Sequence, residues 1–187
     1  MKRYLLPSLK LTLVFIIICA VIYPLFIATV ARLAPGAGKG ETVSVNGKVV
    51  GYANIGQKFT EDKYFWSRPS AVEYNAAGSA GSNKGATNPD YLKQVQDRID
   101  TFLVHDPSVK KEDIPSEMVT ASGSGLDPDI SAQGAYVQVA RIAKTRNISA
   151  EKIKALVEKQ IQKPLLGLFG PGKVNVLKLN IELDQLK

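Results

Sequence analysis

The 187-residue sequence contains one cysteine, one histidine and one tryptophan. With Cys19 as its single cysteine, the chain can form no internal disulfide and no zinc site built of thiolates. With His105 as its single histidine, sites with two histidine ligands and mechanisms that need two histidines are excluded. His105 comes at the predicted end of a helix, where it can bond the last carbonyl groups. We therefore expect no catalytic residue, no metal site and no cofactor of its own.

The charge is positive but unevenly distributed. The chain has 24 Lys and Arg residues against 17 Asp and Glu residues, a net charge of +7. The basic residues are scattered, and no RNP-like, zinc-finger or basic-zipper pattern accompanies them, so we expect no nucleic-acid partner. Residues 112–140 are the exception, because they contain no Lys or Arg and five acidic residues: Glu112, Asp113, Glu117, Asp127 and Asp129.

The longest apolar run is residues 11–31, which carry no charge. As a helix, a run of this length spans about 31 Å, close to the ~30 Å hydrocarbon core of a bilayer. A cleaved signal peptide has a shorter apolar region, and a lipoprotein signal needs a small residue where Ile18 precedes Cys19. We therefore predict an uncleaved transmembrane helix, kinked by Pro24 toward its outer end.

The flanking charges predict the orientation of this helix. Lys2, Arg3 and Lys10 precede it without any acidic residue, so the positive-inside rule places the N-terminus in the cytoplasm. The predicted organisation is a cytoplasmic tail at 1–10, a transmembrane helix at 11–31, a linker at 32–40 and an extracytoplasmic domain at 41–187. The expected location is the cell membrane, in a single pass.

The domain is predicted to be a small α+β fold. Asn46-Gly47 between two β-prone runs indicates a hairpin over 42–52, and 57–89 are expected to form a long ordered loop. Helices are predicted over 89–104 and after the N-caps Ser131 and Ser149, the second with Tyr136, Val139, Ala140 and Ala143 on one face. Alternation over 174–183 predicts a half-buried strand.

Three segments are candidate functional sites. Residues 78–85 are Gly-rich, but Asn83 and Gly85 stand where a P-loop needs Gly and a hydroxyl, which favours a structural loop. Asp127 and Asp129 fit either a turn or a surface that attracts cations. Tyr64, Phe65, Trp66 and Arg68 fit either core packing or a partner interface, since Trp, Tyr and Arg dominate binding hot spots.

Several motifs, in one order along the chain, match a known family. They are Ile55-Gly56-Gln57-x-Phe59, Tyr64-Phe65-Trp66-x-Arg68-Pro69-Ser70-Ala71, Gly81-Ser82-Asn83, Thr87-Asn88-Pro89, Val119-Thr120-Ala121-Ser122-Gly123-Ser124-Gly125-Leu126-Asp127-Pro128 and Val174-Asn175-Val176-Leu177. The sequence thereby resembles the C subunit of the Kdp potassium-transporting ATPase. It departs from the family pattern at Ala80 in the Gly-rich stretch, at Ala140 in Gln138-Val139-Ala140-Arg141, and at Asp129, where the family often has His.

The resemblance implies an accessory subunit that is not itself an enzyme. Its partners would be a channel-like subunit that selects potassium and a catalytic P-type subunit that binds ATP-Mg, both within the lipid membrane. The family is credited with assembly and with raising the ATP affinity of the catalytic subunit, in some accounts by nucleotide contact at Ser79, Gly81, Ser82 and Asn83. The predicted topology disfavours that contact, because an outside domain cannot reach cytoplasmic ATP.

Two further hypotheses concern the function of the domain. Five acidic residues without a base suggest that Glu117, Asp127 and Asp129 face the outer potassium entrance, where a negative potential raises the local cation concentration. The alternative to the accessory subunit is a membrane-anchored module that binds the cell envelope independently of any transporter.

Overall fold

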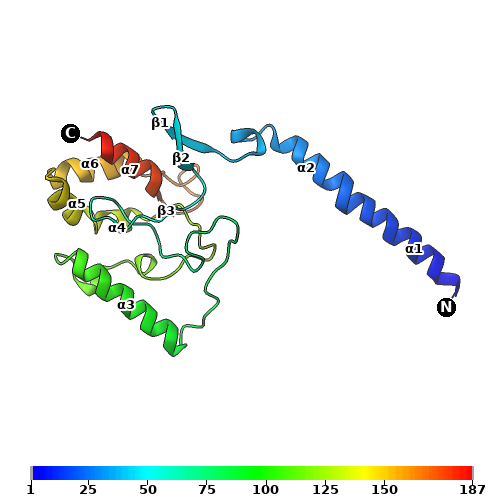
Figure 1. The fold of residues 1–187 in the computed structure, drawn as a ribbon, viewed down its shortest axis with the longest axis horizontal. Helices are drawn as coiled ribbons and strands as arrows, with labels where there is room; N and C mark the ends of the chain where they lie inside the picture. The colour runs from blue at the N-terminus through cyan, green and yellow to red at the C-terminus, as the bar shows by residue number, and fades with distance from the viewer. Residues whose placement is uncertain (1, 187) are drawn as a thin grey trace. The chain divides into compact units, whose positions relative to one another are not determined.

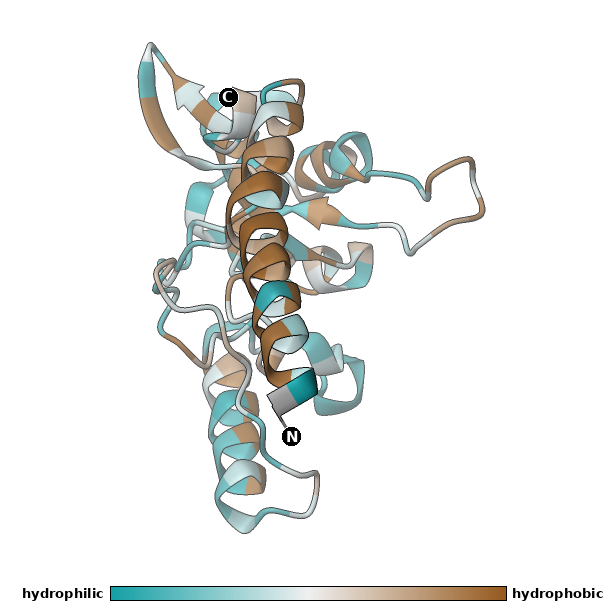
Figure 2. Ribbon diagram, turned by 90° about the vertical axis from the view of Figure 1, so that its right-hand side faces the viewer, coloured by the Kyte–Doolittle hydropathy of each residue, from teal (hydrophilic) through white to brown (hydrophobic). Residues whose placement is uncertain are grey.

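The computed structural model describes residues 2–186 and divides into two compact units, with the division between Thr42 and Val43. The first unit is chiefly one uninterrupted helix, built of α1 (Lys2–Ile17), a π-helical turn (Ile18–Ile22) and α2 (Tyr23–Ala31) (Figure 1). Side chains from Arg3 to Val30 are exposed, and apolar residues surround the helix (Figure 2). By length and composition, Arg3–Ala31 can cross a membrane.

Pro24 changes the hydrogen bonding of this helix. Tyr23 N–H donates to the carbonyl of Ile18, five residues back, and Pro24 follows directly. Proline has no N–H and its ring crowds the preceding turn, so the helix widens there. The structure thus has a π-helical turn just before Pro24, after which the helix continues to Ala31, and the kink itself stays a prediction.

The hairpin predicted over 42–52 is confirmed. Strands β1 (Thr42–Val45) and β2 (Lys48–Tyr52) form a two-stranded sheet. Asn46 and Gly47 have φ of 49° and 78°, the left-handed values that a type I′ turn requires. The segment before it contains a short 3₁₀ turn, Pro35–Gly38.

The first predicted helix of the domain is also confirmed. Residues 53–88 contain turns and bends but no helix or strand, as expected for the long loop. Helix α3 (Pro89–His105) follows, and the Asn88 side chain accepts a hydrogen bond from Tyr91 N–H at its start. Two single 3₁₀ turns, Lys111–Asp113 and Ser116–Met118, come next. Phe102 is the one buried residue of α3, so the C-terminal end of this helix attaches it to the core.

The second predicted helix is divided in two. Ser131 Oγ accepts from Gly134 N–H and begins α4 (Ala132–Tyr136), and α5 (Val139–Arg146) starts after a turn at Val137 and Gln138. The predicted shared face is therefore wrong in part, because Val139 is buried whereas Ala140 is exposed. The side chain of Gln138 binds another segment at this break, as described below. Ser149 caps α6 (Ala150–Gln160) as predicted.

The strand predicted over 174–183 is wrong. Only β4 (Val174–Asn175) is extended; it pairs antiparallel with β3 (Asp129–Ile130), with Asp129 opposite Asn175. Helix α7 (Val176–Gln185) follows, and Asn175 accepts from Lys178 N–H as its N-cap. The buried residues Val176, Leu179, Asn180 and Leu183 recur at three- and four-residue spacing, the period of a helix.

The core of the domain lies between α4–α7 and the loop that contains Phe65. Its fully buried side chains include Phe65, Ile142, Ile153, Val157, Leu179 and Leu183. Helix α6 packs on α4, α5 and α7. An isolated two-stranded sheet is marginal in water, so packing of these helices and of the long loop supplies most of the stability.

Candidate functional site

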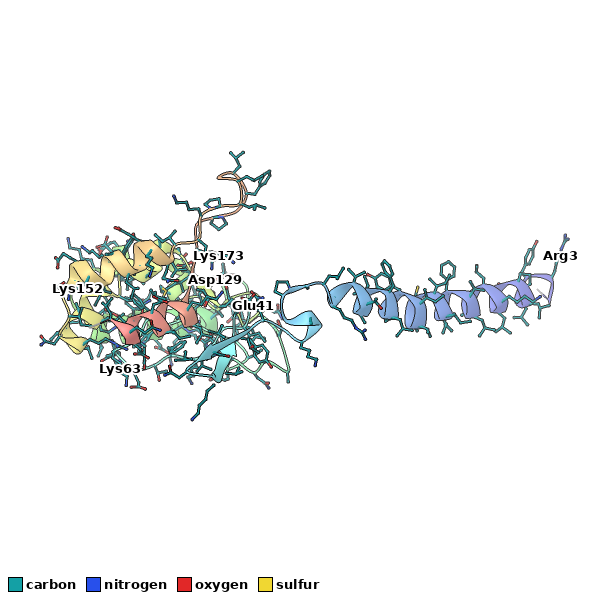
Figure 3. All side chains as sticks on the ribbon, turned by 90° about the horizontal axis from the view of Figure 1, so that it is seen from above. Arg3, Glu41, Lys63, Asp129, Lys152 and Lys173 are labelled. Atoms are coloured by element: carbon teal, nitrogen blue, oxygen red, sulfur yellow. The ribbon has the colours of Figure 1, made fainter. Side chains whose placement is uncertain are left out.

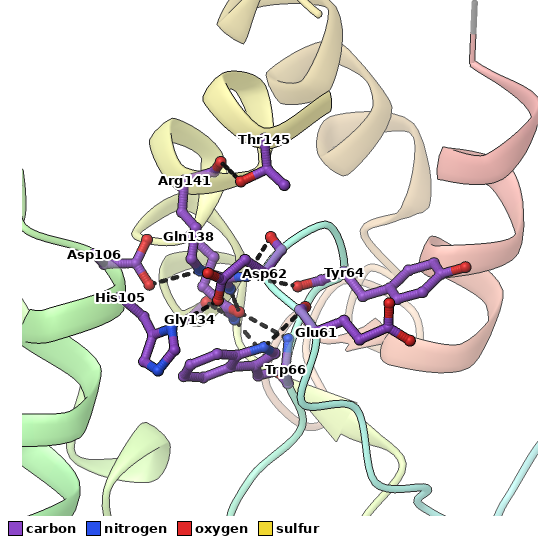
Figure 4. Close-up of polar contacts among 10 residues, drawn as sticks. All are labelled: Glu61, Asp62, Tyr64, Trp66, His105, Asp106, Gly134, Gln138, Arg141 and Thr145. Carbon is purple, nitrogen blue, oxygen red and sulfur yellow. Dashed lines mark hydrogen bonds and ion pairs between the residues drawn. The ribbon is translucent and has the colours of Figure 1, made fainter. Parts of the chain in front are cut away.

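Arg141, on α5, is the centre of a buried polar network (Figure 4). Its Nε donates to Asp106 Oδ2 at 2.9 Å, and one terminal nitrogen donates to the carbonyls of Asp62 and Tyr64 at 2.6 and 3.0 Å. The other terminal nitrogen donates to Gln138 Oε1 at 2.7 Å. The guanidinium therefore ties the long loop to the end of α3 and to α5, with an exposed side-chain fraction of only 2%.

Asp106 supplies the negative charge of this network. It lies at the C-cap of α3 with its side chain fully buried, and its Oδ1 has no hydrogen-bond partner within residues 2–186. Burial raises the pKa of the Asp106 carboxyl above its usual 3.8, while the charge and hydrogen bond of Arg141 act in the opposite direction. Desolvation of the carboxylate dominates.

Gln138 and Trp66 complete the network. Trp66 N–H donates to Gln138 Oε1 at 2.7 Å, and Gln138 Nε2 donates to the carbonyl of Gly134 at 2.8 Å. The Arg141 guanidinium lies 4.4 Å from the centre of the Trp66 ring, a cation–π contact. Gln138 and Arg141 are three residues apart, so their side chains lie on one side of the chain, and both contact Trp66.

His105 lies at the rim of the network. The sequence predicted that its side chain bonds the last carbonyls of α3, but in the structure it contacts Asp62 instead. Its Nδ1 is 2.7 Å from Asp62 Oδ1, and its ring packs on the edge of Trp66. A hollow of about 310 Å³ lies beside the pair, lined mainly by apolar side chains that include Phe102 and Met118. His105 and Asp62 are both partly exposed, so their hydrogen bond is a surface contact that holds the loop against α3.

The four predicted partner residues belong to the scaffold. Phe65 is fully buried, and its backbone N–H and carbonyl both bond the Asn180 side chain, at 2.8 and 3.0 Å. Tyr64 donates to Asp184 at 3.1 Å, and Arg68 donates to Asp127 at 2.9 Å. Core packing therefore describes Phe65. A partner contact stays a prediction for the exposed parts of Tyr64, Trp66 and Arg68.

The three predicted cation-attracting residues lie near one another but are bonded within the domain. Asp127 Oδ2 accepts from Arg68, and Asp127 Oδ1 accepts from Asp129 N–H at 3.0 Å, which is the turn expected from sequence. Asp129 pairs with Lys173 at 2.6 Å (Figure 3). Glu117 Oε1 accepts from Ser131 N–H at 2.8 Å. These contacts neutralise much of the charge of Asp127 and Asp129.

The Gly-rich stretch packs against the loop at 122–125. Ser79 Oγ donates to the carbonyl of Ser124 at 2.9 Å, and a Cβ at Gly81 would stand 3.0 Å from the carbonyl of Gly123. Ser82 is half-buried and Asn83 is exposed. Helix α3 begins only at Pro89, so the stretch lacks the adjoining helix N-terminus of a phosphate-binding loop.

The contacts of these residues join segments of the domain that are far apart in the chain. Among residues 2–186, no group of three or more His, Cys, Asp or Glu side chains could hold a metal ion. Sequence reasoning missed the roles of Asp62, Asp106, Gln138 and Arg141. The one signal in the sequence is the three-residue spacing of Gln138 and Arg141 in Gln138-Val139-Ala140-Arg141, which places the two polar side chains on one side of the chain.

The fold defines a class of protein that joins one helix fit to span a membrane to a small α+β domain. The family model described as "KdpC: K+-transporting ATPase, c chain" matches residues 5–185. The chain belongs to this family, whose members are subunits of the K⁺-transporting ATPase complex.

Curated relatives agree with the family match. A protein of Flavobacterium psychrophilum, named potassium-transporting ATPase KdpC subunit, is 63% identical over 179 residues, which are 96% of each chain. The protein of the same name from Flavobacterium johnsoniae is 63% identical over 99% of this chain and 100% of its own. That of Bacteroides fragilis is 57% identical over 99% and 98%.

Proposed function

We propose that this chain is the non-catalytic accessory subunit of a high-affinity, ATP-driven potassium importer. It stabilises the assembly of a channel-like potassium-selecting subunit with a catalytic P-type subunit, and it raises the ATP affinity of the latter. The observation that carries the proposal is the family match over residues 5–185. The domain supports it, because its central network joins the long loop to the end of α3 and to α5, as a structural subunit requires.

The proposed topology puts the N-terminus in the cytoplasm and residues 41–187 outside. Lys2, Arg3 and Lys10 before the span support this orientation. An outside domain does not contact cytoplasmic nucleotide, so its effect on ATP affinity passes through the membrane subunits as a coupling free energy. The packing of Ser79 and Gly81 against residues 122–125 supports a structural role for the Gly-rich stretch.

The first prediction is stoichiometric co-purification. The tagged chain is expressed with the other transporter subunits at low external potassium, and potassium-stimulated ATPase activity is measured with and without it. We expect an intact complex with the chain present and loss of the stimulated activity in its absence. Purification of the chain alone, with the ATPase unaffected, would contradict the proposal and favour the independent envelope-binding module.

We also propose that the acidic stretch 112–140 raises the local cation concentration at the outer potassium entrance. Glu112 and Asp113 are exposed and make no ion pair among residues 2–186. They therefore test the idea more cleanly than Asp127 and Asp129, whose neutralisation would also leave Arg68 and Lys173 unpaired. The electrostatic attraction falls with ionic strength, because the charges are exposed.

The second prediction concerns the apparent KM for potassium. Glu112→Gln combined with Asp113→Asn is expected to raise this KM at low ionic strength and to leave it unchanged at high ionic strength. The matched control is Glu151→Gln, which neutralises an exposed acid of α6 outside the acidic stretch. An equal KM for both variants and the wild type at low ionic strength would show that the stretch does not attract the transported ion.

A further inference from the structure

The loop between α6 and β4 carries an apolar tip, residues 164–170. Leu165, Leu166, Leu168 and Phe169 have exposed fractions of 70, 81, 81 and 63%. They form the largest group of exposed large apolar side chains in the described part of the second unit. In Figure 3 this loop projects from the domain beside Lys173. Exposed apolar groups of this kind mark contact sites with membranes or partners.

The tip is held in one shape by its own backbone. Gln162 pairs with Lys173 at its base, and Leu165 pairs with Phe169, both antiparallel. Leu166 and Gly167 form the turn with φ of 55° and 74°. Leucine seldom adopts a positive φ, and at this position it gains no burial within the domain. Packing inside the domain therefore does not account for an apolar side chain here.

The N–H groups of the tip are bonded mostly within the tip itself. The N–H groups of Leu165, Gly167, Leu168 and Phe169 donate to carbonyls within residues 164–169, so four of the six N–H groups from 165 to 170 are bonded internally. Unbonded backbone groups are what makes loops costly to bring into an apolar phase. Most N–H groups of this tip therefore keep their hydrogen bonds when the tip leaves water.

Lysines flank the tip on both sides. Lys159, Lys163 and Lys173 are exposed. Lys159 and Lys173 pair with Glu182 and Asp129, whereas Lys163, next to Pro164, makes no ion pair among residues 2–186 and is the lysine most available to a lipid headgroup. Apolar side chains combined with flanking lysines match an anionic lipid surface, whose headgroups attract basic residues. The core of a protein interface, in contrast, is depleted in lysine.

The chain itself keeps the domain close to a bilayer. The helix able to span a membrane ends at Ala31, and β1 begins at Thr42. The intervening ten residues reach at most about 35 Å when extended. A tether of this length holds the domain surface near lipid at a high effective concentration, so a weak apolar contact suffices for binding.

From these observations we infer that residues 164–170 form a second membrane contact, inserting Leu165, Leu166, Leu168 and Phe169 into the interface of an anionic bilayer. The inference rests on the membrane-anchored subunit proposed above. It extends that proposal, because the domain would be held against the bilayer at two points and would have a restricted orientation over it.

The test is a fluorescence measurement on the full chain in lipid nanodiscs. Cys19→Ser removes the native cysteine, and Leu166→Cys provides one site for an environment-sensitive fluorophore. The control places the label at Val104→Cys on α3, where the native side chain is 77% exposed. Discs of phosphatidylglycerol and phosphatidylcholine are compared with discs of phosphatidylcholine alone, each with and without doxyl-labelled quencher lipid. Both faces of a nanodisc are accessible, so the result does not depend on the orientation of the helix.

We expect the label on the tip to shift to shorter wavelength and to be quenched by doxyl lipid in anionic discs, while the label at position 104 keeps its aqueous emission. Lys163→Gln should lower the tip–lipid binding constant about fivefold in anionic discs at low salt and leave it unchanged in neutral discs. Replacing Leu168 and Phe169 together by serine should abolish the shift in anionic discs.

Two results would overturn the inference. The first is aqueous emission from the tip in both kinds of disc. The second is protection of the tip only when the other transporter subunits are present, without quenching by lipid, which would mean that the tip docks on a protein partner. Failure of the subunit role is detected separately, by co-purification, which uses no label on the tip.

Discussion

Replacing Arg141 by methionine is expected to lower the free energy of unfolding by about 3–5 kcal/mol, because the variant buries the Asp106 carboxylate without its partner. Both side chains are almost fully buried in the native protein, at 2 and 0% exposed. The carbonyls of Asp62 and Tyr64 also lose their donor. The measurement is urea denaturation of the full chain in detergent, followed by the fluorescence of the single tryptophan, Trp66.

Two variants serve as controls for Arg141→Met. Lys58→Met breaks a surface pair with Glu73, whose side chains are 59 and 85% exposed, and should change stability by about 1 kcal/mol or less. Adding Asp106→Leu to Arg141→Met should recover part of the loss, because the unpaired charge is removed. A loss for Arg141→Met no larger than that for Lys58→Met would show that the network does not stabilise the fold.

The pH dependence gives an independent measurement of the same ion pair. Burial raises the pKa of Asp106 above 3.8, so the folded state binds this proton more tightly than the unfolded state. The contribution of Asp106 to stability is then greatest below pH 3.8 and falls as the pH rises through the folded pKa. Arg141 lowers the pKa of Asp106, so without Arg141 this pKa rises further and the protonated carboxyl persists to higher pH. Arg141→Met should therefore lie closer to the wild type at pH 5 than at pH 8.

Asn180→Ala is expected to produce the second large effect. The Asn180 side chain is buried and satisfies both the N–H and the carbonyl of Phe65, at 2.8 and 3.0 Å. Each buried group left without a partner costs about 1–3 kcal/mol, so the variant should lose about 2–5 kcal/mol in the same denaturation experiment. The long loop would be released from α7, and with it the contacts that place Tyr64 and Trp66.

Two comparisons separate this hydrogen bonding from packing and from helix capping. Asn180→Leu fills the same space without the amide and should be nearly as unstable as Asn180→Ala. Asn88→Ala removes the partly buried N-cap of α3 and should cost about 1 kcal/mol. Wild-type stability of Asn180→Leu would mean that Phe65 is held by packing alone.

Local chemistry determined the elements that the sequence predicted correctly. Asn46-Gly47 encodes the hairpin because both positions adopt positive φ. Asn88, Ser131 and Ser149 each accept a backbone hydrogen bond at the start of a helix. The uncharged run 11–31 is long enough for a membrane by composition alone. Each of these signals depends on residues close together in the chain, so no knowledge of the fold is needed to interpret them.

The tertiary structure decided the remainder. Alternating apolar residues over 177–183 fit a strand as well as a helix, and burial of Val176, Leu179, Asn180 and Leu183 against the core selects the helix. In the Arg141 network, Arg141 bonds Asp106, which lies 35 positions away in the chain, and Asp62, which lies 79 positions away. Asn180 bonds Phe65, which lies 115 positions away. Pairings at such separations leave no periodic trace in the sequence, because they depend on which surfaces meet once the chain has folded. The sequence alone therefore determined the hairpin, three helix starts and the long apolar helix, whereas the fold decided the structure of residues 176–185 and which polar side chains became scaffold.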